Sequence, residues 1–187
     1  MSNLGTVVAF SGAIGVGKSS LSRALQERLG WPRVSFGQYV RDYAAANGKD
    51  ADDRATLQQL GQALVLTNVA GFVAGVLGQV DWRSGGNLIL DGLRHVEVRQ
   101  ALLHELGADF TLKLVHVSVD EDTRQQRAQE NGIEQRMLSR YDQDLTEAQM
   151  ARIMPPYADL VIDGTLPPRM AMDMIVARLG LRQFEAA

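Results

Sequence analysis

Short apolar runs alternate with longer amphipathic stretches along this chain. Runs rich in aliphatic and β-branched residues predict buried strands at 6–11, 33–36, 87–92, 110–119 and 160–163. The stretches between them place apolar residues three or four positions apart, which is typical of helices. Strands that alternate with helices predict a parallel sheet covered on both faces. We therefore expect an α/β protein with three layers, α/β/α, around a five-stranded parallel sheet.

Glycines and polar caps mark where several predicted helices begin and end. Gly30 and Gly107 follow apolar stripes and predict helix ends. Asp52 or Asp53 predicts the start of a helix that continues to about Val80. The last predicted helix buries an apolar face made of Ala171, Met174, Ile175 and Leu179.

A glycine-rich loop connects the first predicted strand to the first predicted helix. Residues 12–19 match G-x-x-x-x-G-K-[ST], the phosphate-binding P-loop. Backbone N–H groups at a helix start bind phosphates, Lys18 is expected to reach the β and γ phosphates, and the Ser19 hydroxyl is expected to bind Mg²⁺. We expect a P-loop nucleoside-triphosphate hydrolase fold, with nucleotide contacts from Gly12, Ala13, Gly15, Val16, Gly17, Lys18, Ser19 and Ser20.

Composition narrows the function classes. The 187 residues predict one domain, 1–187, and the net charge of −3 gives no strong nucleic-acid signal. With no cysteine, disulfides and thiolate metal sites are excluded. A first strand that begins near Thr6 leaves no room for a signal peptide, so we expect a cytoplasmic protein. The apolar stretch 63–80 contains Asn68 and several glycines, so we expect a buried or subunit-facing helix, with a homodimer possible, and no membrane span.

A carboxylate and several arginines follow the predicted strand ends, where parallel sheets bind ligands. Asp91 closes an apolar strand, and could hold Mg²⁺ or accept a substrate proton; the alternative is an aspartate that caps a turn. Arg41 and Arg94 lie just beyond two strand ends, and two further pairs flank a break at Gly132: Arg124 with Arg127, and Arg136 with Arg140. Each arginine alone is compatible with a solvated face, but the group favours charge stabilisation during phosphoryl transfer.

The chain resembles the adenylate-kinase-like nucleoside monophosphate kinases and their dephospho-CoA-kinase-like relatives. The stretch 35–41 (SFGQYVR) is similar to their acceptor-binding S-x-G-D-x-x-R, and 91–94 (DGLR) to their D-G-[FL]-(P)-R. The resemblance implies that Gly37, Arg41 and Arg94 bind an acceptor monophosphate. It also implies an acceptor-binding helical segment at about 37–80.

The same resemblance extends to the donor side. It implies a short lid at about 124–140, in which Arg124 stacks on the donor adenine and Arg140, with Arg136, closes on the transferred phosphoryl group. Gly164 and Thr165 resemble the late loop that touches the donor base. The implied cofactors are ATP and Mg²⁺, with Ser19 and Asp91 as metal ligands, and the implied catalytic residues are Lys18, Asp91, Arg124 and Arg140.

Three functions remain open from the sequence. The first is transfer of the ATP γ-phosphate to a nucleoside or deoxynucleoside monophosphate, a small-molecule substrate. The second is a kinase for another acceptor, such as a CoA precursor or a sugar hydroxyl. The third is a nucleotide-binding regulator. Gln38 replaces the usual aspartate, and the stretch 51–80 matches no specific kinase, so the acceptor is not assigned.

Overall fold

The computed structural model describes residues 4–82, 86–130, 132 and 153–182. Its central sheet contains β1 (Gly5–Ser11), β2 (Arg33–Ser35), β3 (Leu88–Asp91), β4 (Phe110–Ser118) and β5 (Leu160–Asp163). The strands pair in the order β2-β3-β1-β4-β5, and every pair is parallel. The predicted five-stranded parallel sheet is confirmed.

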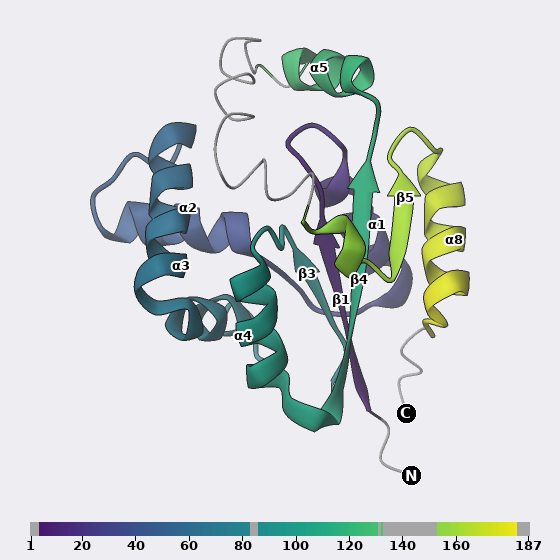
Figure 1. The fold of residues 1–187 in the computed structure, drawn as a ribbon, viewed down its shortest axis with the longest axis horizontal. Helices are drawn as coiled ribbons and strands as arrows, with labels where there is room; N and C mark the ends of the chain where they lie inside the picture. Colours follow the sequence, from purple (N-terminus) through teal and green to yellow (C-terminus); the bar gives the residue numbers. More distant parts are fainter. Residues whose placement is uncertain (1–3, 83–85, 131, 133–152, 183–187) are drawn as a thin grey trace.

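Helices cover both faces of this sheet (Figure 1). One face packs against α1 (Lys18–Leu29) and α8 (Pro168–Leu179), and the other against α2 (Phe36–Ala46), α3 (Arg54–Leu77) and α4 (Val96–Leu106). Consecutive residues of β1 alternate between the two cores, since Val7 and Ala9 face one and Val8 and Phe10 the other. The three-layer α/β/α architecture is therefore confirmed.

The carboxyl ends of the strands lie together at one edge, where α5 (Glu121–Glu130) follows β4 (Figure 1). Two short 3₁₀ turns, η1 (Gly107–Asp109) and η2 (Pro155–Tyr157), precede β4 and β5. Asp53 caps α3 by accepting a hydrogen bond from the Thr56 N–H at 2.9 Å. Of the two caps that the sequence allowed, Asp53 is the one used.

Three details differ from the sequence prediction. Phe36 begins α2 instead of ending β2, because the Ser35 hydroxyl accepts from the Gln38 N–H at 3.2 Å and caps the helix. Met174 is 36% exposed, because the buried face of α8 is made by Ala171, Met172 and Ile175.

The third difference is that α3 ends at Leu77 and is interrupted at Asn68, which has non-helical φ and ψ angles of −159° and 74°. By length and composition alone, α3 is the one helix of the described chain that could cross a membrane, with a mean hydropathy of 1.7 over its most apolar window. A core helix passes the same test, and six α3 residues, among them Phe72 and Val76, are buried against the sheet and its neighbouring helices.

Candidate active site

The P-loop lies between β1 and α1, as predicted. Gly15 and Gly17 have φ angles of 89° and 93°, in the left-handed region that side chains with a Cβ rarely adopt. Gly17 is also the N-cap of α1. The Lys18 ammonium donates to the Ala13 carbonyl oxygen at 3.1 Å, so the lysine side chain lies over its own loop. This is the geometry that binds a polyphosphate at a helix start.

The turn after β5 and helix α5 pack against the outside of this loop. Arg127 Nη1 donates to the Gly164 carbonyl oxygen at 2.9 Å and lies 3.5 Å from the Val16 carbonyl oxygen. A Cβ at Gly164 would collide with that same Val16 oxygen, so only glycine permits this close approach. Thr165 is exposed, and its hydroxyl donates to Asp163 at 2.7 Å.

Arg124 is buried beside the P-loop. Its Nε and Nη2 atoms each donate to the Glu121 carboxylate at 2.9 Å, and these hydrogen bonds hold the pKa of Glu121 below its ordinary value. The Arg124 carbonyl oxygen would lie 3.0 Å from a Cβ placed on Gly15. Ala128 of the same helix lines the cavity described next. The stacking of Arg124 on a donor base stays a prediction, and Arg136 and Arg140 lie outside the described residues.

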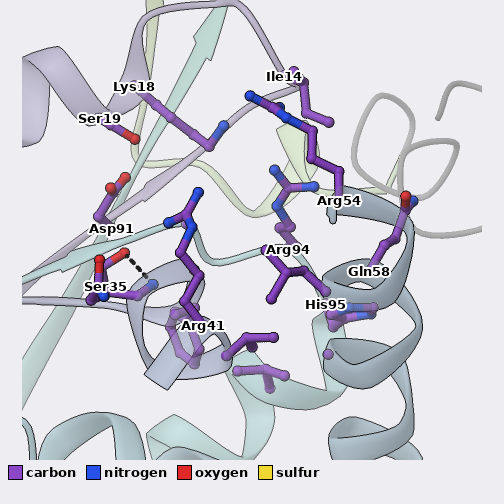
Figure 2. A pocket seen from close by; sticks show the side chains of 18 of the residues that line it. Ile14, Lys18, Ser19, Ser35, Arg41, Arg54, Gln58, Asp91, Arg94 and His95 are labelled. Carbon is purple, nitrogen blue, oxygen red and sulfur yellow. Dashed lines mark hydrogen bonds between the residues drawn. The ribbon is translucent and has the colours of Figure 1, made fainter. Parts of the chain in front are cut away.

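A cavity of about 550 Å³ opens beside the P-loop at the carboxyl edge of the sheet. Lys18 enters it from α1, Arg41 from α2 and Arg94 from the turn after β3. Figure 2 shows these three side chains pointing toward one another. The structure thus brings together cations that are far apart in the sequence. Of the remaining predicted contacts, Gly15, Ser19, Gly37 and Asp91 line the cavity; Gly12, Ala13, Val16, Gly17, Ser20, Gly164 and Thr165 do not.

Asp91 is 4% exposed and is held by Arg33, which no sequence motif indicated. Arg33 Nη2 lies 2.6 Å from Asp91 Oδ2, and Arg33 Nε donates to the Ser22 hydroxyl at 2.9 Å. Ser22 in turn donates to the Ser19 carbonyl oxygen at 3.0 Å. The available signal was a charged residue inside a short buried strand.

The residues present fit a magnesium ion. Asp91 Oδ1 is buried and has no hydrogen-bond partner, and Figure 2 shows Asp91 and Ser19 on the same side of the cavity. No group of three histidine, cysteine, aspartate or glutamate side chains gathers into a metal site within the described residues. Mg²⁺ with phosphates typically takes only one or two protein oxygens and keeps several waters.

The first half of α3 supplies a wall of the cavity that the sequence analysis left without named residues. Arg54, Gln58 and Gln62 line it, spaced four positions apart on one helix face. Gln58 Nε2 is buried and has no hydrogen-bond partner. The sequence shows polar residues at positions i, i+4 and i+8 on the helix face opposite Leu60, but it does not show what that face contacts.

His116 lies on β4 directly below the P-loop. Its Nδ1 atom is 2.9 Å from the Ser11 hydroxyl. Burial lowers the pKa of His116, and the nearby Lys18 charge lowers it further. Its burial and its contact with Ser11 indicate a structural role for His116. His95, in contrast, lines the cavity.

Comparison with known proteins agrees with this geometry. The family model described as AAA domain matches residues 8–151. A cytidylate kinase from Bdellovibrio bacteriovorus is 35% identical over 111 residues, which cover 54% of this chain and 51% of that protein. A cytidylate kinase from Marinomonas sp. is 31% identical over 101 residues, covering 52% of this chain and 43% of that protein. The chain thus matches about half the length of these curated relatives.

Solved structures share the fold at low sequence identity. A sugar kinase from Janibacter sp. superposes with a TM-score of 0.60 at 13% identity, covering 98% of this chain and 99% of that one. Shikimate kinase from Aquifex aeolicus superposes with a TM-score of 0.57 at 17% identity, covering 93% and 96%. The fold is therefore the one found in P-loop kinases. Because the family model covers well over half of the chain, this protein belongs to the AAA-domain family of P-loop proteins.

Proposed function

We propose that this chain is an ATP-dependent kinase that transfers the γ-phosphate of ATP to a nucleoside or deoxynucleoside monophosphate. The observation that carries the proposal is the convergence of Arg41 and Arg94 on the cavity that Lys18 enters. Two guanidinium groups bind a phosphate in a fixed orientation. The match to two cytidylate kinases supports a pyrimidine nucleoside monophosphate as the first acceptor to test.

The residues would divide the work of an in-line transfer. A terminal oxygen of the acceptor phosphate attacks the γ phosphorus while the bond to the β–γ bridging oxygen breaks, and ADP leaves with that electron pair. Arg41 and Arg94 orient the attacking phosphate, and Lys18 offsets charge on the β and γ phosphates. Ser19 and Asp91 would hold Mg²⁺, which neutralises phosphate charge when bound. Because the attacking oxygen already carries negative charge, no general base is required.

A second acceptor class is favoured by one specific observation. A hydroxyl acceptor must lose a proton, and Asp91, which lines the cavity, has a buried Oδ1 with no hydrogen-bond partner. Asp91 would then act as the base. Against this, its Oδ2 is already paired with Arg33, and a sugar has no charged group to engage Arg41 and Arg94.

An acceptor panel tests the proposal directly. ADP release from ATP and Mg²⁺ is measured with each ribo- and deoxyribonucleoside monophosphate, with dephospho-CoA, and with sugars and shikimate. We expect turnover with at least one monophosphate and none with the hydroxyl acceptors. Turnover with a hydroxyl acceptor alone would contradict the monophosphate assignment. Tight ATP binding without turnover on any acceptor would instead favour a nucleotide-binding regulator.

A further inference from the structure

We propose that the first half of α3 recognises the nucleobase of the acceptor and that Gln58 is a specificity-determining residue. The inference rests on the proposed monophosphate kinase function, since it assigns the other end of the same acceptor. It names the acceptor as a nucleotide whose base presents a hydrogen-bond donor beside an acceptor.

The cavity has two chemically different ends. Arg41 and Arg94 point toward Lys18 and the P-loop, where the phosphates belong. Gln58 and Gln62 line the cavity from α3, one helical turn apart. Figure 2 shows Gln58 across the cavity from Ser19 and Asp91. An acceptor phosphate held at the arginines therefore leaves the rest of the molecule to extend toward the α3 wall.

Beside these amides, the cavity has apolar surface suited to a flat ring. Phe36 and Phe72 both line the cavity, with ring centroids 5.5 Å apart in an edge-to-face arrangement. Val98 of α4 and Leu57 of α3 add aliphatic surface. Aromatic and aliphatic side chains contact the face of a nucleobase favourably, which leaves the edge of the base for polar groups.

Gln58 has a polar atom that the protein itself does not satisfy. Its Nε2 atom is shielded from solvent and has no hydrogen-bond partner. A buried amide donor without a partner costs free energy. Exchanging the amide nitrogen and oxygen assignment puts an acceptor at the same spot and leaves the need for a partner unchanged. A ligand that supplies the missing partner recovers that cost on binding.

A carboxamide pairs with two neighbouring atoms of opposite hydrogen-bond character. The Watson–Crick edge of a nucleobase offers such a pair, as in the amino group and ring nitrogen of cytosine. An isolated sugar hydroxyl offers no planar edge of this kind. Gln58 therefore favours a nucleotide as the acceptor over a sugar or another simple hydroxyl compound.

The test compares Gln58→Leu with Gln59→Leu. Gln59 is the next residue of α3, is exposed and does not line the cavity. For the wild type's best monophosphate, we expect Gln58→Leu to raise the acceptor KM by about tenfold or more and to reduce discrimination between bases, with the ATP KM changed less than about twofold. Gln59→Leu should match the wild type. Gln58→Glu keeps the side-chain shape but removes the N–H donor, so it should also weaken binding of the acceptor.

Calorimetric binding of the monophosphate to the ADP-loaded protein gives a readout that does not depend on turnover. Equal affinities for wild type and Gln58→Leu would overturn the role of Gln58 while leaving the kinase function intact. Transfer to no monophosphate in the wild type, with no calorimetric binding either, would overturn the proposed function and this inference with it. A parallel rise in the ATP KM would also overturn the inference, because it would place Gln58 on the donor side.

Discussion

The P-loop and the cavity beside it are built by different means. On the proposed donor side, the shape depends on the backbone: the turn at Gly164 approaches the Val16 carbonyl too closely for a side chain, and Gly17 starts α1 with a left-handed φ. On the proposed acceptor side, side chains reach inward, Arg41 and Gln58 from helices and Arg94 from the turn after β3. A donor site made of backbone is disrupted by adding atoms, whereas an acceptor site made of side chains is disrupted by removing them.

The largest effect is expected at Lys18, a residue of the P-loop that acts through its side chain. Lys18→Ala removes the cation that we expect to face the β and γ phosphates, so kcat should fall by at least about a thousandfold. Steady-state ADP release measures this change. Lys49→Ala, an exposed loop lysine, serves as the control and should retain wild-type turnover. Full turnover in Lys18→Ala would contradict its placement on the transferring group.

Arg41→Ala should change the KM for the acceptor without a matching change in the KM for ATP. Arg41 makes no hydrogen bond or ion pair with the described residues, so its loss should affect substrate more than the fold. A hydrogen bond to a charged group contributes about 1.5–3 kcal/mol, so we expect the acceptor KM to rise by about 10- to 100-fold and the ATP KM to stay within about twofold. Arg178→Ala, at an exposed position of α8, is the matched control. Equal changes in both KM values would disprove an acceptor role.

The sequence predicted the donor side in more detail because its signals are local. Glycines and Lys18 occur within eight residues, between a strand and a helix, and the fold has little freedom to place them elsewhere. The Arg33–Asp91 pair joins residues 58 positions apart, and such pairing depends on the order of strands in the sheet. Arg41 and Arg94 were singled out by their places just beyond two strand ends, and only the family resemblance gave them a role toward the acceptor.

The cavity wall made by the first half of α3 could not be predicted from the sequence for a related reason. The apolar run of α3 indicates one long helix, yet Asn68 interrupts it and its side chain accepts a hydrogen bond from the Gly71 N–H at 2.8 Å. Asparagine favours such local side-chain hydrogen bonds over continued helix. Which face of the first half meets the cavity follows from packing against α2 and α4, and periodicity alone does not specify it.

Gly164→Ala adds a methyl group next to the P-loop and tests whether the close backbone approach there matters. A Cβ at Gly164 would meet the Val16 carbonyl oxygen and approach Val119 Cγ1 to 2.9 Å. Overpacking of this kind costs about 1–3 kcal/mol, so Gly164→Ala should raise the ATP KM by at least about fivefold.

Gly61→Ala is the matched substitution on the acceptor side. Its Cβ would meet only Val40, at 3.7 Å, and alanine is favoured in a helix, so its ATP KM should stay at the wild-type value. Similar ATP KM values for the two variants would show that the donor turn tolerates displacement.

The smallest expected effect is a pH dependence of stability that originates at His116, which contacts Ser11 just before the P-loop. Burial lowers the pKa of His116 below its ordinary value of 6.5, so the unfolded chain binds this proton more readily than the folded one. The free energy of unfolding should therefore fall as pH drops below about 6.5.

Urea unfolding at pH 7.5 and 5.5 measures this loss. His116→Gln keeps a polar partner for Ser11 but cannot take up a proton, so it should lose less stability over this range than the wild type. The exposed His104→Gln on α4 should retain the full wild-type dependence. An unchanged dependence in His116→Gln would mean that the loss arises elsewhere, and that the contact beneath the P-loop tolerates a charged imidazole beside Lys18.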